Sequence, residues 1–291
     1  MDIYGKITDR IIARLESGTI PWRRPWKNGM PINYVTRKEY RGVNLLLLPQ
    51  GGEWLTFLQC KDKGGKVKKG EKGEMIVYAG SYTPKEENLS VEDREAGITS
   101  GREKSRKFLR HSTVFHISQC EGIESRLEET DNPNPDSCPD QKAETTLKEY
   151  VLREGIRLEL VGTSQRAYYS PEKDMIRMPT REKFSDNAGF YGTAFHEAAH
   201  STGHRDRLDR IKENAAFGTG EYSREELVAE IAAAYLCNLH GLETESGFDN
   251  SAAYIRAWLA QLRNDTRLIV QVASAAQKAT DYILGKKTAA E

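Results

Sequence analysis

The motif HEAAH at residues 196–200 constrains the fold of this chain more than any other feature. Residues four apart lie on one face of a helix, so His196 and His200 can place two imidazoles on one metal ion. Zinc is the ion that this motif usually holds, and Zn²⁺ is the cofactor that we expect. A zinc site needs a third protein ligand, so another element must pack against this helix.

The third ligand has several candidates. Glu226, in the predicted helix SREELVAEIAAAY, follows His200 by 26 residues, and a helix packed on the first one can hold its carboxylate rigidly. We favour it for that reason. Asp206 completes the spacing HExxHxxGxxD and is the main alternative; Glu225 and Glu230 are others. Glu230 lies one turn beyond Glu226 and could instead orient a histidine.

Glu197 is the expected catalytic residue. It is rotated by about 100° from the preceding histidine, so it flanks the ion instead of binding it. There it can accept a proton from a water molecule that the metal activates. Tyr222 and His204 are weaker candidates for stabilising an oxyanion.

The length of 291 residues is about twice that of a usual domain, which predicts two domains. Hydrophobic residues make up 38% and charged residues 30%, as in a globular protein. A proline-rich acidic segment at 126–142 resembles a linker and separates predicted domains at 1–125 and 143–291. The charged stretch at 84–107 is interpreted as a loop inside the first domain.

The pattern of apolar residues predicts an α+β protein. Apolar residues spaced by four indicate an amphipathic helix that Gly18 ends. MIVYAGSY and TVFHIS are typical of strands, and WLTFLQCKDKGG of a strand or short helix. In the second half, LELVG, RAYYSP and KDMIRMP predict three strands, followed by helices that include the HEAAH segment, with Ser185 or Asp186 as its N-cap and Gly203 as its stop. The strand DMIRMP is expected to be an exposed edge, which either binds an extended peptide or is merely short and polar to prevent aggregation.

Several features argue against membranes and secretion. The mean hydropathy is −0.67, and no run of about 18 apolar residues occurs. The charged N-terminus has no apolar core of the kind that a secretory signal has. Cys60, Cys120, Cys138 and Cys237 form no CxxC pair. We therefore expect a cytoplasmic protein with no membrane partner.

The first half carries a basic, aromatic composition that suits nucleic acid. Residues 1–125 hold 22 Lys and Arg against 16 Asp and Glu, and the remainder holds 21 against 27. Flat rings can stack on exposed bases while cations contact phosphates, which favours single-stranded DNA. The alternative is a core of tryptophans beside a solvated lysine turn. The candidate DNA-binding residues are Trp22, Arg23, Arg24, Trp26, Lys27, Arg41, Lys66, Lys68, Lys69 and Lys72.

The whole chain resembles the ArdC antirestriction family of conjugative plasmids. The phrases DIYGKITDRIIARLESGTIPWRRPW, YRGVNLLLL and TVFHISQCEG resemble its N-terminal single-stranded-DNA-binding domain, which also occurs fused to plasmid primases. FHEAAHSTGHRDRL, YSREELVAEIAAAYL and AAYIRAWLAQLRND resemble its zincin-like, gluzincin-type metallopeptidase domain. The resemblance implies metal ligands at His196, His200 and Glu226, and a catalytic Glu197.

The resemblance also implies a function, namely protection of incoming single-stranded plasmid DNA from host restriction. The expected reaction is peptide hydrolysis, with a substrate among host restriction or DNA-bound proteins. The alternative is a non-enzymatic protein that coats DNA or acts as a decoy, with an idle or structural metal site. A nuclease ranks last, because nucleases usually hold magnesium with carboxylates.

Overall fold

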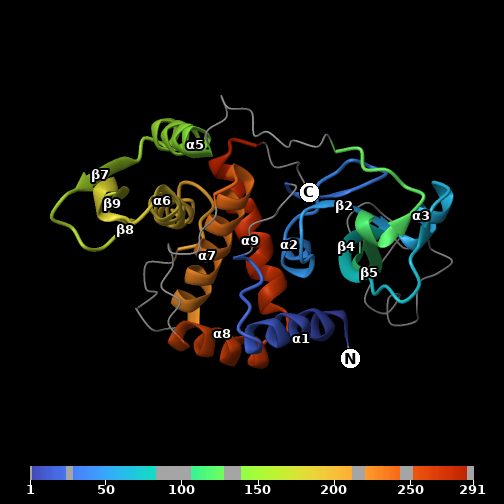
Figure 1. Cartoon of the computed structure of the whole chain (residues 1–291). Coiled ribbons are helices and arrows are strands. Elements are labelled where there is room, and N and C mark those ends of the chain that lie inside the picture. The colour runs from blue at the N-terminus through green and yellow to red at the C-terminus, as the bar shows by residue number, and fades with distance from the viewer. Residues whose placement is uncertain are drawn as a thin grey trace.

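The computed structural model describes residues 2–23, 29–82, 106–127, 139–211, 220–242 and 252–286. Within them the prediction of an α+β fold is confirmed (Figure 1). The loop predicted at 84–107 lies almost wholly outside the described residues, and so does most of the linker predicted at 126–142.

The N-terminal half begins with the predicted amphipathic helix. Asp2 caps it by accepting a hydrogen bond of 2.7 Å from the backbone N–H of Gly5, and Gly18 follows its end with a φ of +78°. The described elements of this half are α1 (Ile3–Glu16), β1 (Pro31–Asn33), α2 (Val43–Leu47), β2 (Gly52–Thr56), α3 (Phe57–Asp62), β3 (Lys66–Val67), β4 (Glu74–Tyr82), β5 (Arg106–His116), η2 (Ile117–Gln119) and β6 (Cys120–Glu121).

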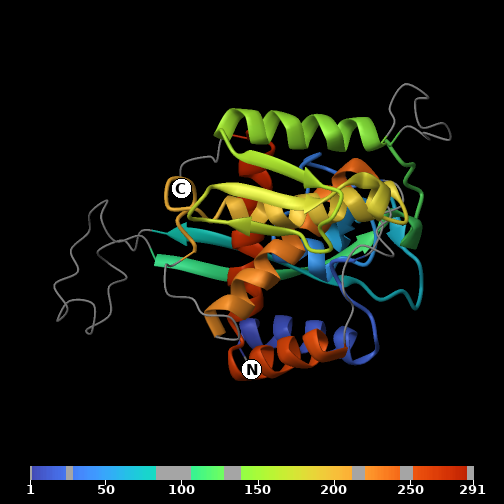
Figure 2. The same ribbon diagram turned by 90° about the vertical axis from the view of Figure 1, so that its left-hand side faces the viewer.

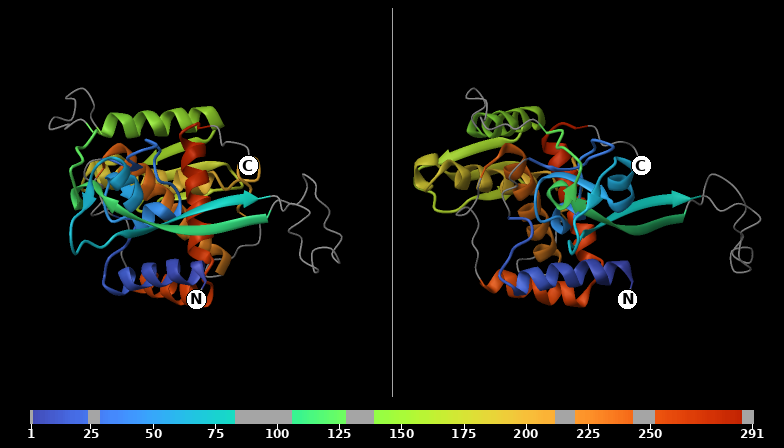
Figure 3. Two further views of the ribbon diagram at one scale, coloured as in Figure 1. Left: turned by 90° about the vertical axis from the view of Figure 1, so that its right-hand side faces the viewer. Right: turned by 45° about the vertical axis from the view of Figure 1, so that its right-hand side comes forward.

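Two sheets organise the N-terminal half. Its larger sheet has the strand order β1-β2-β5-β4, and β3 pairs with β6 separately. The antiparallel pair β4–β5 is long, running in register from Glu74↔Val114 to Tyr82↔Arg106. In Figure 3 this pair projects well beyond the helices of the body.

The C-terminal half places a small sheet beside a group of helices. The described elements are α5 (Pro139–Glu154), β7 (Arg157–Val161), β8 (Tyr168–Ser170), β9 (Met175–Pro179), η3 (Arg181–Lys183), α6 (Asn187–Ser201), α7 (Gly220–His240), α8 (Ala252–Asn264) and α9 (Leu268–Ile283). The helix α5 begins at Pro139, inside the predicted linker. The three predicted strands are present, and Asp186 caps α6 by accepting from the N–H of Gly189 at 2.7 Å.

The order of the small sheet corrects one prediction. The strands are arranged β7-β9-β8, with β7 parallel and β8 antiparallel to β9. The segment DMIRMP forms β9, so it is the central strand and not an exposed edge. The prediction was wrong because the chain leaves a gap between β7 and β8 that β9 then fills, an insertion that no local pattern reveals. Figure 2 shows this sheet below α5 and in front of α6.

One hydrophobic core joins the two halves. Ile7 and Ile11 of α1 and Leu45 of α2 are buried in the same cluster as Phe195 of α6 and Ile269 of α9. In Figures 1 and 2, α1 lies alongside α8 although the two are far apart in the sequence. Side chains from both sides of the predicted domain boundary thus pack into the same hydrophobic core. In the described parts of the chain, no helix combines the length and apolar character needed to span a membrane.

Candidate metal centre

Helices α6 and α7 pack side by side and bring together the two histidines of the motif and one carboxylate. His196 Nε2 and His200 Nε2 lie 3.1 Å apart. Glu226 places one oxygen 3.5 Å from His196 Nε2 and the other 3.5 Å from His200 Nε2. Ligands at about 2.1 Å around a tetrahedral ion are about 3.4 Å from one another, so these atoms fit a single zinc-sized ion.

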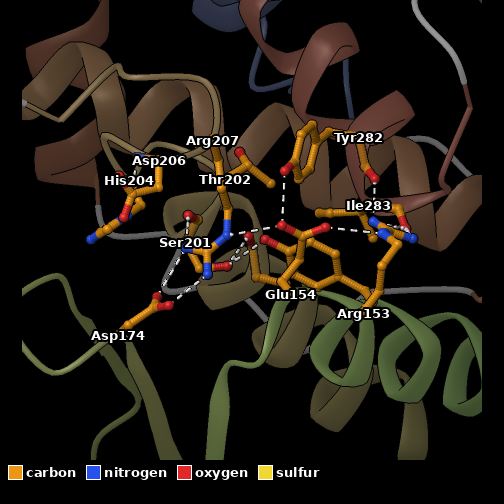
Figure 4. A network of polar contacts seen from close by, with 12 residues as sticks. Arg153, Glu154, Asp174, Ser201, Thr202, His204, Asp206, Arg207, Tyr282 and Ile283 are labelled. Atoms are coloured by element: carbon orange, nitrogen blue, oxygen red, sulfur yellow. Dashed lines mark hydrogen bonds and ion pairs between the residues drawn. The ribbon is translucent and has the colours of Figure 1, made fainter.

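The alternative ligand Asp206 lies outside this cluster. Its side chain is 78% exposed, and one carboxylate oxygen is 3.4 Å from Nδ1 of His204. The neighbouring Arg207 is only 4% exposed and forms ion pairs with Asp174 at 2.6 Å and Glu154 at 3.3 Å. Figure 4 shows these contacts of Arg207 with Asp174 and Glu154, and Asp206 beside His204. The geometry therefore favours Glu226 as the third ligand.

The surroundings of the cluster stabilise positive charge. Burial alone would lower the pKa of His196, but a hydrogen bond that Glu226 accepts from the ring and the charges of Glu197 and Glu230 outweigh it and raise the pKa to about 9. Carboxylates that hold a proton on an imidazole so firmly also stabilise a metal cation at the same place. The electrostatics thus agree with the ligand geometry.

Each histidine also faces a second carboxylate from α7. Glu230 Oε2 is 4.0 Å from His196 Nδ1, and Glu225 Oε1 is 3.6 Å from His200 Nδ1. Burial raises the pKa of Glu225, but hydrogen bonds from His200 and Arg210 lower it below its usual value. Carboxylates in this position orient histidine ligands in many metal sites. The sequence left two roles open for Glu230, metal ligand or residue that orients a histidine, and its position beside His196 Nδ1 suits the second.

The cluster opens into a cavity of about 1200 Å³ between β8, α6, α7 and α9. His196, Glu197 and His200 line it, and so do Tyr168 and Tyr169 of β8. Glu197 is 6% exposed and lies next to the two histidines, as the motif predicts. A carboxylate, two imidazoles and an adjacent open space are the components that metal-assisted hydrolysis requires.

Three residues predicted to bind DNA instead join the two halves of the chain. Trp22 is 1% exposed, and its ring packs edge-on against Trp258 with centroids 5.4 Å apart. Arg23 is 9% exposed and pairs with Glu230 at 2.7 Å. Arg41 forms an ion pair with Asp281 of α9. The burial of Trp22 contradicts the prediction that it stacks on bases. The guanidinium of Arg23 is engaged by Glu230, and its contact with phosphate stays a prediction that this ion pair disfavours.

The lysines of residues 66–72, the second group of candidate DNA-binding residues, are exposed. Lys66 pairs with Glu121 at 2.9 Å, and Lys68 donates to the carbonyl of Ser118 at 2.8 Å. Lys69 and Lys72 are exposed in the turn that follows β3. Their contact with DNA stays a prediction. Arg24, Trp26 and Lys27, and the side chain of Tyr222, lie outside the described residues.

Sequence reasoning overlooked two kinds of residue. Phe57 and Leu58 of α3 are 57% and 68% exposed, although the phrase WLTFLQCKDKGG was predicted only to be a strand or short helix and neither residue was named as a surface candidate. The segment forms both a strand and a short helix, and the capping box of Thr56 and Gln59 marks where the helix begins. Arg23 near the metal cluster had no local signal, because its partner Glu230 is 207 residues away.

Known proteins match both halves. The N-terminal domain of the anti-restriction factor ArdC matches residues 1–115, and the zincin-like metallopeptidase family matches residues 146–275. The metal-free crystal structure of the antirestriction protein ArdC from plasmid R388 is 36% identical, with a TM-score of 0.75 over 97% of each chain. This chain belongs to the ArdC antirestriction family. A Mn(II)-bound structure of the R388 protein is 35% identical, with a TM-score of 0.76 over 98% of each chain.

Two curated relatives extend the family. The protein y4eC of Sinorhizobium fredii (strain NBRC 101917 / NGR234) is 31% identical over 100% of this ArdC-family chain and 94% of its own length. The DNA primase TraC of Escherichia coli is 32% identical over 97% of this chain. The chain spans only 27% of the length of that primase.

Proposed function

We propose that this ArdC-family protein binds single-stranded DNA with its N-terminal half and hydrolyses peptide bonds at the centre between α6 and α7. The observation that carries the second part is the convergence of His196, His200 and Glu226 beside Glu197 in an open cavity of about 1200 Å³. Its biological outcome would be protection of incoming plasmid DNA against host restriction. The protein substrate would be a restriction protein or another DNA-bound protein.

His196, His200 and Glu226 are the residues that would hold a divalent metal. Two imidazoles and one carboxylate suit Zn²⁺, and the Mn(II)-bound structure of the R388 relative supports a divalent ion in general. When bound, the ion would supply Lewis acidity that polarises the carbonyl of the scissile peptide. Glu197 would accept a proton from the attacking water and deliver it to the leaving amine. The buried position of Glu197 limits competition from bulk water.

The edge of the small sheet offers a place for the substrate backbone. Because β9 is central, β8 is the edge strand on the cavity side, and Tyr168 and Tyr169 of β8 line the cavity. An extended peptide could pair with β8 as an added strand, which would present its carbonyl to the metal centre. We propose this role for β8 in place of the one expected for the segment DMIRMP.

The DNA-binding surface that we propose is centred on α3, β3 and the following turn. Residues 57–73 contain six lysines against two acids. Phe57 and Lys61 lie four residues apart on α3, so an exposed ring and a cation share one helix face. A base can stack on the ring while lysines contact phosphates. Lys66, Lys68, Lys69 and Lys72 extend the same basic segment.

A non-enzymatic role is the second candidate. The exposed lysines of this segment do not line the metal cavity, so DNA could be coated without any reaction. In that case the metal centre would be idle or structural, and only the N-terminal surface would determine protection.

A comparison of four full-length proteins separates the two candidates: wild type, Glu197→Gln, His196→Ala and Asp206→Ala. Restriction and replication proteins are incubated with each and with single-stranded DNA, with and without a chelator, and protection of transferred DNA is scored in cells. Glu197→Gln should keep metal and DNA binding but lose hydrolysis by about 10²–10⁴-fold, because no proton acceptor remains. Asp206→Ala should behave as wild type.

The outcome in cells decides between the roles. Loss of protection in Glu197→Gln to the same extent as in His196→Ala supports the enzyme. Full protection by both variants, together with no cleavage that the chelator suppresses, supports DNA coating and contradicts the peptidase proposal.

A further inference from the structure

The two histidines of the metal centre are supported by two matching sets of contacts. His200 faces Glu225, which receives hydrogen bonds from Arg210 at 2.8 and 3.1 Å. On the other side, Glu230 faces His196 and receives bonds from Nε of Arg23 at 2.8 Å and from its Nη2 at 2.7 Å. Each histidine therefore lies next to a carboxylate, and that carboxylate in turn accepts hydrogen bonds from an arginine.

The two arginines differ in where they come from. Arg210 lies ten residues after His200 and also donates to Thr202 Oγ1 and to the carbonyl of Ala199, both at 2.9 Å. It belongs to the same half of the chain as the metal centre. Arg23 comes from the N-terminal half, where the buried Trp22 beside it packs against Trp258 of α8.

The contacts of Glu230 define what Arg23 can do. Both bonds from Arg23 go to Oε1, and the other oxygen, Oε2, lies 4.0 Å from Nδ1 of His196, close enough for its charge to act on the ring. Glu230 is 5% exposed, so without a cation beside it a buried charge would remain uncompensated. A carboxylate held next to Nδ1 favours the tautomer that carries its proton there, which leaves the Nε2 lone pair free to bind metal.

We propose that Arg23 is a positioning residue of the metal centre, which acts through Glu230 on His196, so that the N-terminal half completes a site otherwise built by the C-terminal half. Arg23 does not touch the metal or the substrate. Its removal lets the Glu230 carboxylate turn away, and His196 loses its fixed orientation. This inference rests on the metal-site part of the proposed function and is independent of whether peptides are hydrolysed.

The test measures metal binding by the full-length chain. Zn²⁺ affinity is obtained by competition with a chromophoric chelator, and the visible absorption of the Co²⁺-loaded protein reports the ligand field. Removing the partners of metal ligands typically costs 10–100-fold in affinity, and Arg23 is one step further out, so we expect Arg23→Gln to raise the Zn²⁺ Kd by about three- to tenfold. The Co²⁺ spectrum should change, and Arg23→Lys should recover part of the affinity.

The matched control is Arg41→Gln. Arg41 also forms an ion pair between the two halves, with Asp281, but it contacts no residue of the metal centre. Its Zn²⁺ Kd and Co²⁺ spectrum should equal those of wild type. A second control combines Arg23→Gln with Glu230→Gln. If Arg23 acts through Glu230, Arg23→Gln should have no further effect on the Kd in that background.

Each outcome has one meaning. If wild type and Arg23→Gln bind Zn²⁺ with equal affinity and give the same Co²⁺ spectrum, Arg23 is only an interface residue and the inference fails. An equal loss in Arg41→Gln, or an unchanged effect of Arg23→Gln in the Glu230→Gln background, also overturns it. If Arg23→Gln does not fold, the same comparisons are made with Arg23→Met, which keeps a long apolar stem and removes the charge. If wild type itself does not bind Zn²⁺, the proposed metal site fails instead.

Discussion

Two segments of the N-terminal half have similar composition and opposite surroundings. Residues 22–41 combine several aromatic side chains with lysine and arginine, and residues 57–72 combine Phe57 with six lysines. In the first segment, Trp22 is buried against the C-terminal half and Arg23 forms an ion pair with Glu230 of that half. In the second, Phe57 and the lysines are exposed.

The difference shows that composition alone does not identify a binding surface. An arginine next to a tryptophan suits both a nucleic acid and a buried contact with a glutamate, because the guanidinium meets phosphate and carboxylate with the same geometry. The described part of the first segment is an internal contact between the two halves. The second segment is the better candidate for DNA. Four experiments test this comparison.

Trp22→Ala should have the largest effect, and the effect should be on stability. Truncation of a fully buried tryptophan costs about 3–5 kcal/mol of the free energy of unfolding. Urea denaturation followed by circular dichroism measures this loss. Trp22→Phe should cost less, since it keeps a ring against Trp258. A Trp22→Ala protein with unchanged stability and weakened DNA binding would reverse our assignment.

Phe57→Ala should weaken single-stranded DNA binding by about 1–3 kcal/mol if a base stacks on this ring. Its stability should be nearly unchanged, because more than half of the side chain is already exposed. Fluorescence anisotropy with a labelled oligonucleotide gives the affinity. Leu58→Ala is the matched control, as it removes an equally exposed side chain that has no ring. Equal losses in both variants would indicate apolar contact without stacking.

The lysines should act through the salt dependence of binding. For single strands the logarithm of the affinity falls with the logarithm of salt concentration by about 0.7 for each phosphate contacted. Combining Lys68→Gln with Lys69→Gln should therefore reduce this slope by about 1.4 if each lysine meets one phosphate. Lys148→Gln on α5 is the control, since it removes an exposed lysine of the other half. An unchanged slope in the double variant would place the DNA elsewhere.

Arg41→Gln should have the smallest effect. Its side chain is 49% exposed, so its ion pair with Asp281 contributes no more than about 1 kcal/mol. The salt slope of DNA binding should stay at the wild-type value, in contrast to the lysine variant. A reduced slope would show that Arg41 contacts phosphate and that the first segment also takes part in DNA binding.

Local patterns were sufficient for much of the secondary structure and for part of the site. The four-residue spacing of His196 and His200 determines that they share a helix face, and Asp186 and Gly18 mark helix ends through backbone chemistry that acts over a few residues. The fold class, the three short strands and the helix that carries Glu226 were predicted for the same reason. These features depend on interactions between neighbours in the chain.

The tertiary structure decided what depends on distant partners. Asp206 and Glu226 are both carboxylates at plausible spacings, and only the packing of α7 on α6 places Glu226 beside the histidines and leaves Asp206 exposed. The insertion of β9 between β7 and β8 made the expected edge strand central. Arg23 reached Glu230 across 207 residues because the two halves share one hydrophobic core. Burial and ion pairing arise from the whole packed chain, so a local sequence pattern carries no information about which partner a side chain will meet.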